Sequence, residues 1–254
     1  MARLSRMAPT QAACIFCGQT DGQLTYEDVY PKWIRKVLGI KGKRVTLEQG
    51  GLSRRPVRVT RNLTVRLGGV CAGCNNGWMS RLETSTRKVM APAMQGREVH
   101  LSSGDQALVA LWATKMALLL ERSMIDIRGR GFAPASHFKW LHDNHSPPPT
   151  TRVWIGAVRD FGDHPAWGHT ATMQHGAEIS EGYLAAFTVG HVLFQVLGIE
   201  NLTVRPVGDG PIALPLRDGR YLVPIWPDLL PEVIWPPPSV FANVDALDSV
   251  WRSA

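Results

Sequence analysis

The chain has 254 residues and a formal net charge of +7 at pH 7. Its apolar fraction of 44% and charged fraction of 19% are those of a folded globular protein, and they exclude a wholly disordered chain. The length suits one large domain or two modest ones. The basic start, Met-Ala-Arg-Leu-Ser-Arg-Met, is not followed by the apolar run of a signal peptide, so we expect a reducing, cytoplasmic location.

Positive charge is concentrated in the first part of the chain. Residues 1–100 hold 17 Lys and Arg against 6 Asp and Glu, whereas residues 101–254 hold 11 against 15. A basic surface attracts polyanions, and neutralising phosphates releases condensed counterions. The charge therefore favours a nucleic-acid partner, and a solvated basic face is the equally simple alternative.

All four cysteines lie in two Cys-x-x-Cys pairs, Cys14 with Cys17 and Cys71 with Cys74. Each pair presents two thiolates to one ion, and two pairs complete the tetrahedral sulfur shell of a structural zinc site. Zinc would contribute on the order of 10–16 kcal/mol of apparent binding free energy to folding. Two disulfides or a redox dithiol are the alternatives; they are disfavoured because nothing indicates secretion and a redox pair normally occurs once, near a βαβ pattern.

The first part of the chain predicts a strand, a helix and a β ribbon, in that order. Residues 23–28 alternate as a short strand, and a helix at 31–38 begins with Pro and is closed by Gly. Residues 43–49 and 56–67 are rich in Val, Thr and Leu, with arginines between them. They predict two strands joined by a Gly-Gly-Leu-Ser turn.

Helical spacing of apolar residues follows the second cysteine pair, with Trp78 on the core side and Pro92 at the end of the helix. Residues 93–104 carry Pro, Gly and Ser and mark the change in charge sign. We therefore predict a domain boundary there, between a basic domain at 1–100 and an accessory domain of unknown role at 101–254.

The second part predicts a buried helix followed by β structure. Asp105 suits the N-cap of a helix that runs to about Ser123 and is apolar almost all round. This helix contains Lys115, and the apolar run at 183–199 contains polar residues, so neither is expected to span a membrane. The other predicted elements are helices at 135–143 and 244–251 and strands at 151–159, 166–173, 183–187, 191–197, 202–207 and 220–224. The expected fold is α+β, with a mainly antiparallel sheet.

Three segments around the cysteines form an ordered set of motifs. They are residues 14–18 (Cys-Ile-Phe-Cys-Gly), 27–33 (Glu-Asp-Val-Tyr-Pro-Lys-Trp) and 71–83 (Cys-Ala-Gly-Cys-Asn-Asn-Gly-Trp-Met-Ser-Arg-Leu-Glu). Together they resemble a bacterial subgroup of the HNH-type endonucleases, which reads Cys-x-x-Cys-Gly, Glu-His-Val-x-Pro-x-Trp and Cys-x-x-Cys-Asn-x-Gly-Trp-Met-Ser-x-Leu-Glu. The resemblance covers about residues 14–90. It implies a zinc-stabilised ββα-metal finger in the N-terminal domain.

The resemblance also implies a catalytic centre. The family places a metal ion, usually Mg²⁺, between a carboxylate and an Asn or His after the last zinc cysteine, which implies Glu27 and Asn75 as ligands of Mg²⁺ or Mn²⁺. Both side chains offer hard oxygen donors. The ion would polarise the scissile phosphate while a base takes a proton from water. The family's base is the His after the carboxylate, and Asp28 stands at that position here.

The Asp at this position puts catalysis in doubt. An unperturbed Asp has a pKa near about 3.9, against roughly 6.5 for His, so it is the weaker base at neutral pH. No histidine precedes His100. Three outcomes are open: Asp28 is a weak base whose pKa is raised by Glu27, or it is a second metal ligand, or the finger is an inactive binding module.

The candidates for phosphate contact are Lys32, Arg35, Lys36 and Arg81. Asn62 aligns weakly with a further family asparagine and is more simply a strand residue.

The histidines of the second part have no recognised ligand spacing. His191 lies in an apolar run and is interpreted as a core histidine. His137, His142 and His145 are interpreted as surface or interface residues.

These observations support two main hypotheses. The first is an HNH-like, metal-dependent endonuclease, a hydrolase acting on DNA, impaired by loss of the histidine. The second is a catalytically inactive HNH-derived module that binds nucleic acid or a protein. A third is a zinc-stabilised structural subunit of a larger assembly, whose basic face docks on RNA or on an acidic subunit. Separately, residues 101–254 are a candidate region for contact with a protein partner.

Overall fold

The structure is a computed structural model of the chain. The residues that it describes are 13–40, 44–49, 55–61, 63–123, 133–162, 166–175, 178–200 and 220–247. Helices and strands are mixed along the chain, so the fold is α+β, as predicted. The HNH-like character of the N-terminal part stays a prediction.

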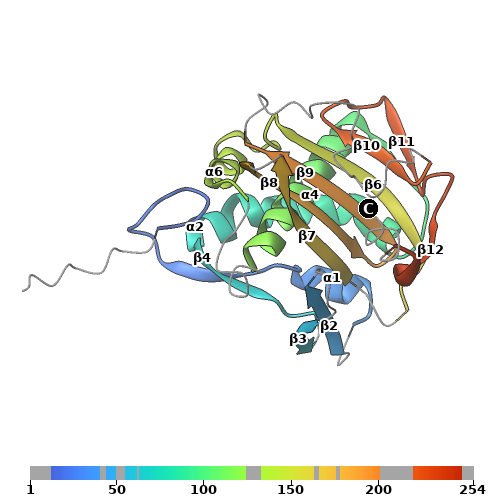
Figure 1. Ribbon diagram of the computed structural model, residues 1–254, viewed down its shortest axis with the longest axis horizontal. Helices are drawn as coiled ribbons and strands as arrows, with labels where there is room; N and C mark the ends of the chain where they lie inside the picture. Colours follow the sequence, from blue (N-terminus) through green and yellow to red (C-terminus); the bar gives the residue numbers. More distant parts are fainter. Residues whose placement is uncertain are drawn as a thin grey trace, which may run out of the picture.

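The largest element is a sheet with the strand order β10-β6-β9-β8-β7 (Figure 1). Its strands are β6 (Thr151–Asp160), β7 (Ala166–His175), β8 (Glu178–Val189), β9 (Val192–Ile199) and β10 (Leu222–Trp226). Neighbouring strands in this order are antiparallel, and β12 (Phe241–Asn243) adds a parallel pair with β6. The sheet is therefore mainly antiparallel, as predicted. The strand predicted at 202–207 lies outside the described residues.

Helix α4 (Ser103–Ser123) lies against this sheet and is buried on nearly every side (Figure 1). It also contacts α3 (Ser80–Met94) and α6 (Ala135–Asn144). A helix with neighbours all round needs apolar residues all round, which explains why α4 lacks a polar face. Within the described ranges, no helix combines the length and hydropathy needed to cross a bilayer.

The start of α4 is defined by reciprocal hydrogen bonds. The Asp105 N–H donates to Ser102 Oγ (3.2 Å), and the Ser102 N–H donates to Asp105 Oδ2 (3.1 Å). This arrangement is a capping box with Ser102 as the N-cap. The predicted N-cap at Asp105 is therefore wrong, because the serine three residues earlier caps the helix and Asp105 lies in its first turn.

The N-terminal part contains two antiparallel strand pairs and a short helix. β1 (Leu24–Asp28) pairs with β4 (Arg66–Cys71), and β2 (Arg44–Gln49) pairs with β3 (Arg55–Arg61). Helix α1 (Lys32–Val37) follows β1, as predicted. The predicted Gly-Gly-Leu-Ser turn lies outside the described residues.

The single strand predicted at 56–67 is wrong, because the chain forms two strands there. Between β3 and β4, the buried Leu63 has a φ of 55°. This left-handed conformation cannot continue an extended strand. After it, β4 pairs with β1, which places Cys71 opposite Leu24 and close to the first cysteine pair.

Three consecutive helical segments begin inside the second cysteine pair, and the chain is kinked at Gly77, whose φ of −90° and ψ of −111° are not helical. They are α2 (Ala72–Cys74), the π-helical turn η1 (Asn75–Met79) and α3. Trp78 is buried, as predicted. The predicted end at Pro92 is two residues early, since α3 continues to Met94.

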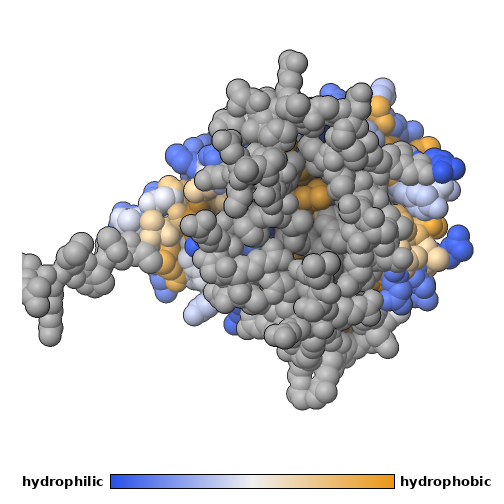
Figure 2. Space-filling view, in the orientation of Figure 1, coloured by the Kyte–Doolittle hydropathy of each residue, from blue (hydrophilic) through white to orange (hydrophobic). Residues whose placement is uncertain are grey.

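A strand pair that the sequence did not predict joins the middle of the chain to its end. β5 (Val99–Ser102) pairs with β11 (Glu232–Trp235). The Trp235 indole N–H also donates to the Gly156 carbonyl in β6 (2.7 Å). The exposed Ile234 lies in β11. On the right-hand side of the molecule, Figure 2 shows hydrophobic and hydrophilic residues interspersed.

Of the helix predicted at 244–251, residues 244–247 are helical and the rest lies outside the described residues.

One hydrophobic cluster contains residues from both sides of the predicted domain boundary. It includes Phe16 and Trp33 from the first part and Trp112 and Phe194 from the second. The ring centroids of Trp33 and Trp112 are 6.0 Å apart. The division into two domains stays a prediction, but the two parts share a core.

Candidate metal centre and the carboxylates beside it

The four cysteines come together in one cluster. One of them, Cys74, is the last residue of α2, which is labelled in Figure 1. Their sulfur atoms all lie within 4.8 Å of one another. Cys14 Sγ is 3.9 Å from Cys74 Sγ, and Cys17 Sγ is 3.6 Å from Cys71 Sγ. Sulfurs at the corners of a zinc tetrahedron with Zn–S bonds of about 2.3 Å lie about 3.8 Å apart. The cluster could therefore hold a metal ion such as zinc. All four thiols are free, so the disulfide alternative is not what the structure contains.

Backbone groups shape the sulfur cluster. The Cys71 N–H donates to Cys14 Sγ (3.3 Å), and the Cys74 N–H donates to Cys71 Sγ (3.4 Å). The Ile15 N–H donates to the Gly69 carbonyl (2.9 Å), which ties the two cysteine turns together. Gly69 has a φ of 91°, a conformation that favours glycine.

The thiols differ in acidity. Burial opposes ionisation of Cys14, but hydrogen bonds from the backbone N–H groups of Cys17, Cys71 and Phe16 outweigh burial and lower its pKa to about 7. Burial and the neighbouring thiols raise the pKa of Cys74. Because a bound cation stabilises thiolates, metal binding here would release protons.

Glu27, predicted as a ligand of the catalytic ion, points into the protein from β1. Its side chain is buried, and its Oε1 accepts a hydrogen bond from Lys115 Nζ at 2.7 Å. Lys115 Nζ also donates to Glu83 Oε1 at 2.5 Å. Burial alone would lower the pKa of Lys115, but the carboxylates of Glu83 and Glu27 outweigh burial and raise it. One buried ammonium therefore bridges two carboxylates.

Asp28, at the position of the family's base, is held by two arginines. Arg66 Nε donates to Asp28 Oδ1 at 3.2 Å, and Arg35 Nη2 lies 3.6 Å from Asp28 Oδ2. Arg35 also donates from Nη1 to Thr64 Oγ1 at 3.1 Å. The Asp28 carboxylate thus has cationic partners on both oxygens.

Asn75 is close in space to the residues before Glu27. Its amide nitrogen donates to Thr25 Oγ1 (3.0 Å) and to the Tyr26 carbonyl (3.3 Å). The start of η1 is thereby attached to β1. The structure thus brings Asn75 to the backbone just before Glu27, while the Glu27 and Asp28 side chains have the cationic partners described above.

The four side chains predicted to contact phosphate differ in their exposure to solvent. Lys32 and Lys36 are exposed on α1, and Arg81 is exposed on α3. Arg35 is half-buried and engaged by Asp28.

The histidines do not form a ligand set. His137 is buried in α6, and its Nε2 is 3.4 Å from Thr150 Oγ1. His142 Nδ1 is 2.8 Å from Asp143 Oδ1. In the part of the chain that the structure describes, the four cysteines are the only group of three or more His, Cys, Asp or Glu side chains placed to share an ion.

His191 is half-buried, and its Nδ1 lies 3.0 Å from the Val158 carbonyl, so its ring has a partner as expected of a structural histidine. Asn62 lies outside the described residues.

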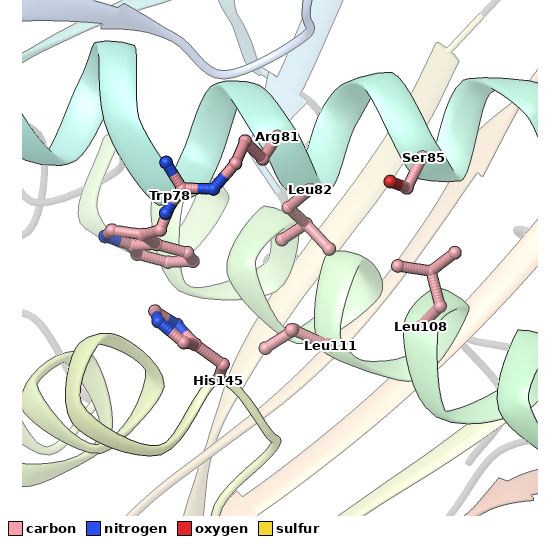
Figure 3. A pocket seen from close by; sticks show the side chains of 7 residues that line it. All are labelled: Trp78, Arg81, Leu82, Ser85, Leu108, Leu111 and His145. Carbon is pink, nitrogen blue, oxygen red and sulfur yellow. The ribbon is translucent and has the colours of Figure 1, made fainter.

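A groove of about 210 Å³ runs between α3 and α4. Its lining residues are Trp78, Arg81, Leu82, Ser85, Leu108, Leu111 and His145. Figure 3 shows Trp78, Arg81 and His145 together at one end, with leucines along the floor. The Trp78 and His145 ring centroids are 5.8 Å apart. His145, interpreted from the sequence as a surface residue, thus borders a groove together with Arg81.

Two residues of this region had no predicted role in the site. Lys115 is the single charged residue in the run Ala107–Leu120, and this isolation in an apolar helix was a signal for a buried partner. Glu83 lies within the third motif, as part of the match to the family and without a role of its own.

Comparison of the chain with protein-family models, with curated proteins and with solved structures finds no match.

Proposed function

We propose that this protein binds nucleic acid, with DNA as the expected polymer, through an HNH-like module that zinc at the four cysteines stabilises, and that it does not cleave its ligand. One observation carries the proposal: the solvent face of α3 is basic. Its exposed residues up to Lys88 are Ser80, Arg81, Thr84, Ser85, Arg87 and Lys88, with no carboxylate among them. Arg81, Arg87 and Lys88 form no ion pair with a described residue. Cations and hydroxyls are the side chains that contact phosphates.

The absence of cleavage is supported by the surroundings of Asp28. A general base must accept a proton from water. The carboxylate of Asp28 would have to do so while Arg66 and Arg35 occupy its oxygens.

DNA binding is tested by fluorescence anisotropy with a labelled duplex over a range of salt concentrations. Log affinity should fall linearly with log salt, since phosphate contacts release counterions. The triple variant Arg81→Ala, Arg87→Ala, Lys88→Ala should reduce that slope by about 2–3, because each lost contact removes about 0.9.

A matched control removes the same charge elsewhere. Lys139→Ala, Arg152→Ala and Arg159→Ala together neutralise three exposed cations on α6 and β6. This variant should keep the wild-type slope. An equal reduction of the salt slope in the two triple variants would show that only the net charge of the protein matters. If the protein has no affinity for DNA at low salt, the proposal is wrong and a protein partner is favoured instead.

Endonuclease activity is the second candidate, favoured by the hydrogen bond from Asn75 to the carbonyl just before Glu27. A plasmid-nicking assay with Mg²⁺ and Mn²⁺ compares wild type, Glu27→Ala and Asp28→His. We expect no nicking by the wild type and a gain of nicking in Asp28→His if the scaffold is otherwise competent. Metal-dependent nicking by the wild type that Glu27→Ala abolishes would establish the endonuclease instead.

A further inference from the structure

A lysine ammonium binds the side chain of Glu27, one of the two ligands that the resemblance implies for a metal ion. Lys115 comes from the middle of α4 and is fully buried. Its Nζ lies 2.7 Å from Glu27 Oε1 and 2.5 Å from Glu83 Oε1. The two carboxylates come from β1 and α3, so three separate elements converge on this ammonium.

The ammonium and a divalent ion would compete for the same oxygens. Mg²⁺ binds carboxylate oxygens at about 2.0–2.1 Å, and an ion held by Glu27 and Glu83 would lie only a few ångström from Lys115 Nζ. Like charges this close repel strongly in a buried site, where the effective dielectric constant is low. The Glu27 side chain therefore does not fit a catalytic Mg²⁺ or Mn²⁺ while Lys115 is in place.

The lysine also supplies the positive charge that the carboxylates need. Buried carboxylates are unstable unless they are paired and hydrogen-bonded. Lys115 satisfies both requirements for Glu27 and Glu83, and the neighbouring Asp28 has Arg35 and Arg66. Each carboxylate around the implied centre already has a cation of the protein itself.

We infer that Lys115 is an internal cation that takes the place of the divalent ion at Glu27, so that Glu27 is a partner of lysine and not a metal ligand in this protein. The inference concerns the metal alone and does not depend on nucleic-acid binding. Removing the charge of Lys115 should therefore leave two converging carboxylates, Glu27 and Glu83, that can accept a divalent ion.

The test is a Mn²⁺ titration of the zinc-loaded protein without DNA, followed by the electron paramagnetic resonance signal of free Mn²⁺. Wild type and Glu27→Gln should give the same titration. Lys115→Met should gain a Mn²⁺ site about tenfold or more tighter than any in the wild type, because a repelling charge beside the ion has been removed. The double variant Lys115→Met, Glu27→Gln should lose that site, and Lys139→Met, which removes an exposed lysine, should not gain it.

Two results would overturn the inference. One is Mn²⁺ binding by the wild type that Glu27→Gln abolishes. The other is a folded Lys115→Met protein that binds no more Mn²⁺ than the wild type. Zinc content and far-ultraviolet circular dichroism report folding, and if Lys115→Met does not fold, the comparison of wild type with Glu27→Gln decides the question by itself.

Discussion

At the scale of single residues, the buried charges and the more exposed charges of the described residues both have partners of opposite sign. Lys115 is fully buried and has two carboxylates, whereas the half-exposed Arg66 shares Asp28 with Arg35. A buried ion pair adds little stability over an apolar alternative, but breaking it leaves an uncompensated charge. The buried group should therefore be sensitive to substitution and the exposed pairs tolerant.

We expect Lys115→Ala to lower the free energy of unfolding by about 3–5 kcal/mol, because it leaves the buried Glu27 and the half-buried Glu83 without a cation. Urea denaturation at neutral pH measures the change. Lys139→Ala, which breaks an exposed pair with Asp143, is the control and should have little effect. Similar losses in the two variants would contradict the role assigned to burial.

His137 should make the protein less stable at mildly acidic pH. Burial lowers the pKa of His137, and Glu200 and a backbone hydrogen bond with Ile199 oppose this without outweighing it. Below about pH 6.5 the unfolded chain takes up a proton that the folded protein resists, so stability falls as pH falls.

The measurement is the free energy of unfolding against pH for wild type and His137→Leu. The wild type should lose at most about 1.4 kcal/mol per pH unit more than the variant below about pH 6.5. His142→Leu, on the same helix but half-buried, is the control. Parallel curves for wild type and His137→Leu would contradict the prediction.

At the scale of elements, α4 organises the fold. It lies against the main sheet and contacts α3 and α6, and its first turn follows directly from β5. The same helix supplies Lys115 to the carboxylates of β1 and α3. Because α4 supports both the core and this buried group, its start must be well defined.

Ser102→Ala should destabilise the protein by about 1 kcal/mol, because the Asp105 N–H loses its capping oxygen. The neighbouring Ser103→Ala is the matched control, since Ser103 is exposed and is the first residue of α4. Urea denaturation compares the two variants with the wild type. A loss in Ser103→Ala as large as in Ser102→Ala would argue against the capping box.

At the scale of the whole molecule, contacts between distant segments hold the chain together. The cysteine cluster joins the first turn to the end of β4, and β11 returns to pair with β5. Trp33 and Trp112 pack together in the shared core. Of these connections, the cysteine cluster is the one that a metal chelator should be able to break.

If the cysteine cluster holds zinc, as proposed, removing the ion with a chelator should lower the unfolding midpoint and reduce near-ultraviolet dichroism, because thiols without a cation no longer attach the first turn to β4. Zinc analysis, a thiol titration and thermal unfolding follow the change. Cys14→Ser should lower zinc content and reproduce the loss, and added zinc should restore the chelated wild type only. An unchanged midpoint after complete zinc removal would contradict the prediction.

Local patterns were enough to predict several parts of this protein. Each Cys-x-x-Cys turn is a local structure, and the long apolar run of α4 indicates a buried helix from its own sequence. The buried position of Trp78 followed from helical spacing in the same way. These features depend on residues that are neighbours in the sequence.

Tertiary contacts settled the rest. The break at Leu63 depends on β4 pairing with β1, and β5 is a strand because β11 lies beside it. The motif identified Glu27 but not its partner, since Lys115 is 88 residues away. Periodicity in the sequence shows which face of an element is buried. Which distant residue packs against that face depends on the tertiary structure, and at Glu27 that residue is Lys115.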